Sequence, residues 1–165
     1  MASADISLRI KGPRVALWSL EARDVEYLRT LRNKLRMFFA DSRVVAPEGQ
    51  TKWWEDYQKN PEDWTFVIRR GSVGIGIIAV YHVDPVERTA CLGRLMIDDG
   101  PIRRKGYAQE AMGLAQAFAR DVLGVLRVRL DVLPDNLPAR SLYLKMGFVV
   151  VGTAPEMVTM EWSVV

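Results

Sequence analysis

The sequence predicts a mixed α/β fold in which a mostly antiparallel sheet carries helices on both faces. The chain has 165 residues, of which 49% are hydrophobic and 26% charged, a normal balance for one globular domain spanning residues 1–165. Helical and β-type hydrophobic spacing alternate along the chain. Three consecutive β-rich stretches are joined by short turns, which favours antiparallel pairing.

The N-terminal part is predicted to form one strand and two or three helices. Residues 15–18 are a short apolar run typical of a strand. Residues 19–39 have apolar side chains at intervals of three and four, which predicts a helix with a break near Asn33. Thr51 is expected to cap the next helix, which stops before a proline and carries three aromatic residues: Trp53, Trp54 and Tyr57.

The rest of the chain is predicted to alternate between strands and two further helices. Residues 64–70, 73–83 and 90–97 are β-rich and separated by turn signals. Residues 108–122 have one apolar face, with Gly124 expected as the C-cap. After an alternating strand at 126–132, Asn136 and Pro138 open a short helix whose buried stripe is expected to be Ala139, Leu142 and Met146. Two strands, 148–151 and 157–164, close the sequence.

Composition excludes several classes of function. The net charge of +3 and pI of about 9.2 favour an anionic ligand slightly but do not indicate a nucleic acid partner. The single cysteine excludes an internal disulfide and a cysteine-built metal site, so no metal is expected. The chain shows no secretory signal and no apolar run long enough for a membrane span. We therefore expect a cytoplasmic protein with no membrane partner.

Two motifs carry the chemistry. The first is R-R-K-G-Y-A at residues 103–108, between a strand and a long helix, where Gly106 lets the backbone approach a ligand closely. Free N–H groups at a helix start, with neighbouring cations, suit a phosphate or pyrophosphate; the alternative is a basic loop that only caps the helix. The second is N-L-P-A-R-S-L-Y-L-K-M-G-F at residues 136–148, which on its own is also typical of a helix with a half-buried tyrosine.

In this order, the two motifs resemble the signature blocks of the GNAT superfamily of N-acetyltransferases. The resemblance covers residues 74–148 closely. G-Y-A-Q-E-A and L-Y-L-K-M-G-F are similar to ribosomal-protein N-terminal acetyltransferases of the RimJ/RimL type. They are also similar to nucleotide-aminosugar N-acetyltransferases of the PseH type. The early Leu31, Arg32, Asn33 and Arg36, with Trp53 and Trp54, favour this second group.

The resemblance implies a GNAT fold and a site for acetyl-CoA, the acetyl donor. The strand before the first motif would splay from the next parallel strand, with the pantetheine arm in the gap and Leu95 nearest the acetyl group. Backbone N–H groups of this strand would stabilise the oxyanion, and Tyr143 would be the catalytic acid for the leaving thiolate. The implied cofactor-binding residues are Leu95, Met96, Ile97, Arg103, Arg104, Lys105, Gly106, Tyr107, Ala108, Asn136, Ala139 and Tyr143.

The sequence leaves the general base and the acceptor open. Members of the superfamily often carry a glutamate on the splayed strand, but C-L-G-R-L-M at residues 91–96 contains no acid, so we expect a water relay. His82 and Tyr81 alternate at a strand end, and one of them should face the acceptor. Cys91 is expected to be a buried thiol, and Glu110 to suit the helix dipole.

The expected acceptor is a small-molecule primary amine such as a nucleotide-linked amino sugar. The alternatives are a protein N-terminus and a catalytically silent acyl-CoA-binding module, and the chain would act as a monomer or homodimer. A pocket with cations and aromatic rings would favour the nucleotide, whereas acidic walls would favour a basic peptide. A P-loop and a dinucleotide-binding fold are disfavoured because their glycine motifs are absent.

Overall fold

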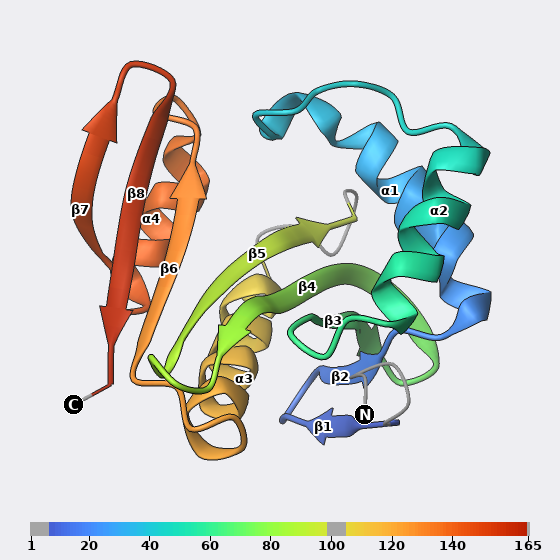
Figure 1. Ribbon diagram of the computed structural model, residues 1–165, viewed down its shortest axis with the longest axis horizontal. Coiled ribbons are helices and arrows are strands. Elements are labelled where there is room, and N and C mark those ends of the chain that lie inside the picture. The colour runs from blue at the N-terminus through green and yellow to red at the C-terminus, as the bar shows by residue number, and fades with distance from the viewer. Residues whose placement is uncertain (1–6, 99–104, 165) are drawn as a thin grey trace.

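Within residues 7–98 and 105–164, which the computed structural model describes, eight strands form one mixed sheet (Figure 1). The strand order is β1-β2-β3-β4-β5-β6-β8-β7, and every neighbouring pair is antiparallel except the parallel pair β5 and β6. The strands are β1 (Arg9–Lys11), β2 (Ala16–Ser19), β3 (Trp64–Arg70), β4 (Val73–Asp84), β5 (Thr89–Ile97), β6 (Arg127–Val132), β7 (Val149–Ala154) and β8 (Met157–Ser163). The predicted fold class is confirmed.

Helices cover both faces of this sheet, as predicted. α1 (Val25–Lys34) and α2 (Pro47–Gln58) pack on one face, over a cluster that includes Val67, Ile77 and Met96. α3 (Tyr107–Asp121) and α4 (Leu137–Lys145) pack on the other face, over a larger cluster around Ile78 and Leu92. Successive strand residues therefore point into different cores, which explains why β3 and β4 are apolar on both sides.

The first predicted helix is too long. The chain makes a short 3-10 turn, η2 (Ala22–Asp24), before α1, because buried Asp24 accepts hydrogen bonds from the Glu21 N–H and from the Arg69 guanidinium. α1 then ends at Lys34, and the 3-10 turn η3 (Arg36–Phe38) follows. The expected break near Asn33 is confirmed to within one residue, and the Asn33 side chain bonds both the N–H and the carbonyl of Val45, so it ties the following loop to the helix.

Four finer expectations were wrong. β1 was missed because it has only three residues and alternates against β2 alone. α2 starts at Pro47, so Thr51 lies inside the helix and its hydroxyl bonds the Pro47 carbonyl rather than capping. In α4 the buried residue is Tyr143, whereas the expected stripe is only half-buried. Val122, expected on the apolar face of α3, is exposed because the helix has already ended at Asp121.

The parallel strands β5 and β6 pair over three residues only. Thr89, Ala90 and Cys91 of β5 lie opposite residues 127–129 of β6, and the pairing stops before Leu92. From that point the two strands diverge, which leaves a gap in the middle of the sheet with α4 and β6 on one side (Figure 1). The divergence of the two strands agrees with the splay that the resemblance implies, and the cavity described below lies at this place.

Candidate active site

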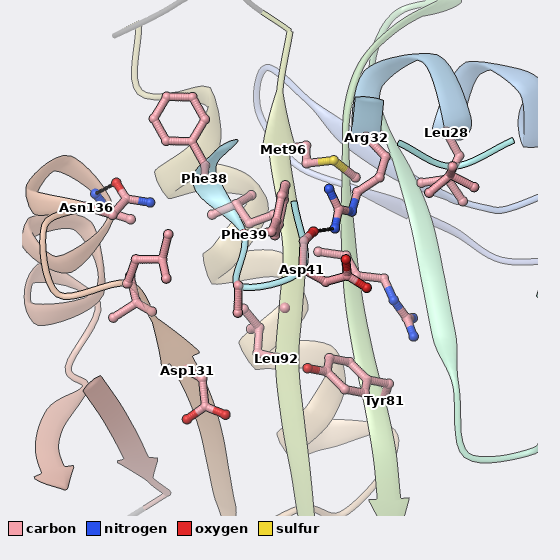
Figure 2. Close-up of a pocket in the computed structure, with 18 of the residues that line it drawn as sticks. Leu28, Arg32, Phe38, Phe39, Asp41, Tyr81, Leu92, Met96, Asp131 and Asn136 are labelled. Atoms are coloured by element: carbon pink, nitrogen blue, oxygen red, sulfur yellow. Dashed lines mark hydrogen bonds between the residues drawn. The ribbon is translucent and has the colours of Figure 1, made fainter. Parts of the chain in front are cut away.

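A cavity of about 810 Å³ opens where β5 and β6 diverge (Figure 2). Its walls come from three parts of the chain that are far apart in the sequence. The strand β5 contributes residues 92–96, the β6–α4 segment contributes Asp131, Asn136 and Tyr143, and the α1–α2 segment contributes residues 38–41 with Arg32. The cavity is therefore continuous from the splayed strands to the face covered by α1 and α2.

The β5 wall contains an irregularity at the level of the cavity. Ile77 pairs with Met96 and Ala79 with Gly93, so Arg94 and Leu95 together lie opposite one residue of β4. Arg94 has a φ of 53°, a left-handed conformation that non-glycine residues rarely adopt. A bulge interrupts the regular ladder of backbone hydrogen bonds, and this one lies in the part of β5 that lines the cavity. Ile97, which was expected to line the cofactor, packs against the larger core instead of lining the cavity.

The Arg94 guanidinium is fixed in the cavity wall. Its Nη1 donates to Asp63 Oδ1 at 2.8 Å and to Thr65 Oγ1 at 2.9 Å. Its plane lies over the ring of Tyr81 at 4.6 Å and near that of Trp53 at 5.5 Å. Its Nε and Nη2 have no hydrogen-bond partner among the described residues. The side chain thus presents a rigid, charged edge with free donors to the cavity.

Tyr143 is placed where the second motif predicts. It lies on α4, is 8% exposed, and lines the cavity beside Ala139 and Asn136. Burial, with a smaller contribution from the nearby Tyr81, raises the pKa of Tyr143 to about 12. The phenol therefore keeps its proton throughout the neutral range. Asn136 caps α4 as expected, since its side-chain oxygen accepts from the Ala139 N–H at 3.4 Å.

The first motif lies partly outside the described residues. Arg103 and Arg104 fall in the segment 99–104, which the structure does not describe. Gly106 is the N-cap of α3 and has a φ of 84°, which explains why a glycine stands there. Lys105 is exposed, and Tyr107 and Ala108 are half-buried in the first turn of the helix.

Two acids line the cavity within residues 7–98 and 105–164, Asp41 and Asp131. Both oxygens of Asp41 bind Arg43, at 2.9 and 2.8 Å, and these bonds hold the pKa of Asp41 well below its ordinary value. Among the described residues, the Asp131 carboxylate accepts a hydrogen bond from the Thr159 hydroxyl alone, at 2.7 Å through Oδ1. Figure 2 shows Asp131 on β6 at the cavity. Asp131 is thus the acid with an oxygen available to a ligand.

Tyr81, His82 and Cys91, which the sequence singled out, lie in different surroundings. Tyr81 faces the cavity, and burial raises its pKa, whereas His82 is exposed outside the cavity. Strand alternation therefore selects the tyrosine. Cys91 is half-exposed rather than buried, and its partial burial raises the pKa of the thiol, which disfavours the thiolate.

The described residues contain neither a metal-binding cluster nor a helix that could span a membrane. Across residues 7–98 and 105–164, no group of three or more His, Cys, Asp or Glu side chains is arranged to hold a metal ion. No described helix is both long and apolar enough to cross a membrane.

Sequence reasoning missed Arg94, Asp131 and Arg14. Arg94 stands beside a glycine in a strand, which is a known signal for a bulge. Asp131 alternates with apolar residues of a strand, so its pattern indicates only an exposed face. Arg14, in the turn between β1 and β2, donates to the Lys105 carbonyl, and nothing in the sequence brings these two residues together.

Comparison with protein-family models matches residues 14–149 to the acetyltransferase (GNAT) domain. The chain therefore belongs to the GNAT acetyltransferase family, and it is an enzyme of the acetyltransferase class. A search of curated proteins finds no match.

Solved structures with the same fold include apo FdhC, a nucleotide-linked sugar GNAT, at a TM-score of 0.82 and 22% identity, covering 96% of this chain and 91% of that one. Another is the spermidine N-acetyltransferase from Vibrio cholerae in complex with CoA and spermine, at a TM-score of 0.81 and 18% identity, covering 92% and 96%. At these identities the likeness shows the fold alone. Neither comparison distinguishes the RimJ/RimL branch.

Proposed function

We propose that the protein transfers the acetyl group of acetyl-CoA directly to the primary amine of a small anionic acceptor, a nucleotide-linked amino sugar. The observation that carries this proposal is the acceptor side of the cavity, where Arg32 and Arg94 lie over aromatic rings and Arg43 is paired with Asp41. Guanidinium groups bind phosphate, and aromatic rings stack on bases or sugars.

The donor lies in the gap between β5 and β6. Leu95 and Met96 line the cavity at the bulge, where the regular ladder is interrupted, which suits the pantetheine arm and the thioester carbonyl. Ile97, with its side chain in the core, contributes its backbone only. At the end of β5, the start of α3 holds the pyrophosphate, through Gly106, Tyr107 and Ala108 with the neighbouring Arg103, Arg104 and Lys105. Asn136 and Ala139 form the opposite wall.

The protons move between three groups. The acceptor enters as an ammonium ion and loses one proton to Asp131, directly or through water, so that nitrogen can attack the thioester carbon. As the carbon–sulfur bond breaks, Tyr143 gives its proton to the thiolate. A second nitrogen proton restores the phenol, and the first passes from Asp131 to solvent. Asp131 replaces the missing strand acid because it is the cavity carboxylate with an unbound oxygen.

A cationic acceptor fits the cavity less well. A polyamine or a basic peptide would place its ammonium groups beside Arg32 and Arg94, while Asp41 is already paired with Arg43. An ammonium group next to a guanidinium destabilises a complex by charge repulsion, so Arg32 and Arg94 select against such acceptors. A protein N-terminus and a module that only binds acyl-CoA are the outcomes that would replace our proposal.

The donor assignment is tested by calorimetric titration with acetyl-CoA of the wild type, Gly106→Ala and Gly71→Ala. Both glycines have positive φ, 84° and 57°, so both substitutions strain the backbone. A Cβ at Gly71 meets nothing within 4 Å, whereas one at Gly106 comes within 3.1 Å of Arg14 and so disturbs the start of α3. We expect micromolar binding by the wild type and Gly71→Ala and at least about tenfold weaker binding by Gly106→Ala. No binding by the folded wild type at millimolar acetyl-CoA would refute the proposal.

A further inference from the structure

The turn between β1 and β2 is tied to the start of α3 by a set of hydrogen bonds around Arg14. Glu110 Oε2 accepts from the backbone N–H of Arg14 at 2.8 Å and of Val15 at 2.7 Å, and Oε1 accepts from Arg14 Nε at 2.9 Å. Burial opposes ionisation of Glu110, but these bonds outweigh it and lower the pKa of the carboxyl below its ordinary value. Glu110 is therefore more than a negative charge suited to the helix dipole, because it also binds the β1–β2 turn through Arg14 and Val15.

The remaining donors of Arg14 reach the backbone of the first motif. Nη1 donates to the Lys105 carbonyl at 2.7 Å and Nη2 to the Gly106 carbonyl at 3.2 Å. The guanidinium also lies over the Tyr107 ring at 5.0 Å, with Arg70 over the same ring at 4.7 Å. One planar group thus holds two successive peptide units of the loop while Glu110 fixes it from behind.

These bonds determine which way the loop N–H groups point. In a trans peptide the N–H points opposite to the carbonyl of the same unit. With the Lys105 carbonyl turned toward Arg14, the Gly106 N–H is turned away from it. The Gly106 carbonyl accepts from Arg14 at 3.2 Å and from the helical Glu110 N–H at 3.1 Å, so Arg14 and the first turn of α3 together orient the Tyr107 N–H. Neither N–H has a hydrogen-bond partner among the described residues. Both donors therefore face the side on which the pyrophosphate lies in the proposed function.

We propose that Arg14 is a positioning residue for the donor: it does not bind acyl-CoA itself but orients the Gly106 and Tyr107 N–H groups toward the pyrophosphate. The inference rests on the proposed function, because the loop must be the pyrophosphate site. It goes further in assigning part of donor affinity to a residue more than 90 positions away, outside both motifs. The planar fork matters as well as the charge, since one group must hold two carbonyls at once.

The test compares acetyl-CoA with S-acetylpantetheine, a donor that lacks the pyrophosphate, by calorimetry and by steady-state kinetics. Arg14→Ala should bind acetyl-CoA about tenfold more weakly, because two oriented donors are lost, and should bind S-acetylpantetheine as the wild type does. The KM for acetyl-CoA should rise while kcat at saturation is unchanged. Arg14→Lys, which keeps the charge but cannot bridge both carbonyls, should show most of the same loss.

Arg120→Ala is the matched control. Arg120 is at the other end of α3, and its side chain is 46% exposed against 50% for Arg14. It should leave both affinities unchanged. Unaltered acetyl-CoA binding by Arg14→Ala, or full affinity in Arg14→Lys, would overturn the inference while leaving the proposed function standing. Equal weakening for both donors would also overturn it, because that is general loss of structure. A folded wild type that binds neither donor would overturn the proposed function, and the inference with it.

Discussion

The donor side and the acceptor side of the cavity are assembled in different ways. The donor side consists of Leu95 and Met96 of β5, the start of α3 and α4, so most of it comes from the two motifs at residues 103–108 and 136–148. The acceptor side combines the α1–α2 segment, the end of β4, Arg94 of β5 and Asp131 of β6. In the proposed function, the donor side serves acetyl-CoA and the acceptor side serves the amine.

The predicted largest effect is on the chemical step at the junction of the two sides. Tyr143→Phe should lower kcat by about 100-fold or more, since the thiolate loses its acid, without changing acetyl-CoA affinity. Because the pKa of Tyr143 is raised to about 12, the wild-type kcat should show no alkaline loss from this group below that pH.

Tyr27→Phe is the control for this variant. Burial raises the pKa of Tyr27 to about 12 as well, and its buried hydroxyl has no hydrogen-bond partner among the described residues, but Tyr27 does not line the cavity. It should leave kcat unchanged. A Tyr143→Phe variant with wild-type kcat at every pH would remove the phenol from the mechanism.

A somewhat smaller effect is expected from Asp131→Asn. The isosteric amide cannot take a proton, so kcat/KM should fall about 10- to 100-fold near neutral pH and recover as rising pH frees the amine itself. Asp41→Asn should keep the wild-type profile, because Asp41 is held by Arg43. If neither variant changes the pH–rate profile, the proton leaves through water alone, as the sequence suggested.

The third effect concerns selectivity. Arg94→Lys keeps a cation near Asp63 but loses the planar edge with its free donors, so the KM for a UDP-linked amino sugar should rise about tenfold. The acetyl-CoA KM should not change. The control Arg129→Ala removes an arginine that pairs with Glu161 outside the cavity and should have no effect on either KM. A rise in both KM values for Arg94→Lys would mean that the bulge, and not the acceptor contact, was disturbed.

The contrast between the two sides also explains how far the sequence could be interpreted. The order of the elements along the chain was predictable, apart from β1, because hydrophobic spacing reports it. The splay and the place of Tyr143 were implied by the resemblance that the two contiguous motifs carry. The burial of Tyr143 in place of Leu142 was not predictable, because rotating this nine-residue helix by one position leaves the spacing of its apolar residues unchanged.

Long-range pairing was the main part that the sequence could not show. Asp24 with Arg69, Asp63 with Arg94 and Arg14 with Glu110 join residues 45, 31 and 96 positions apart. Each pair depends on which strands become neighbours, and local propensity carries no information about that. Asp63 with Arg94 fixes the acceptor side and Arg14 with Glu110 the donor side, so neither side was fully predictable.

The most direct test of the whole account is the rate of CoA release from acetyl-CoA with three acceptors: a UDP-linked amino sugar, spermine and a basic N-terminal peptide. The account predicts that kcat/KM is at least about tenfold higher for the UDP-linked amino sugar, because Arg32, Arg43 and Arg94 line the acceptor side. A preference for spermine or for the peptide would contradict it, and so would CoA release that none of the three amines accelerates.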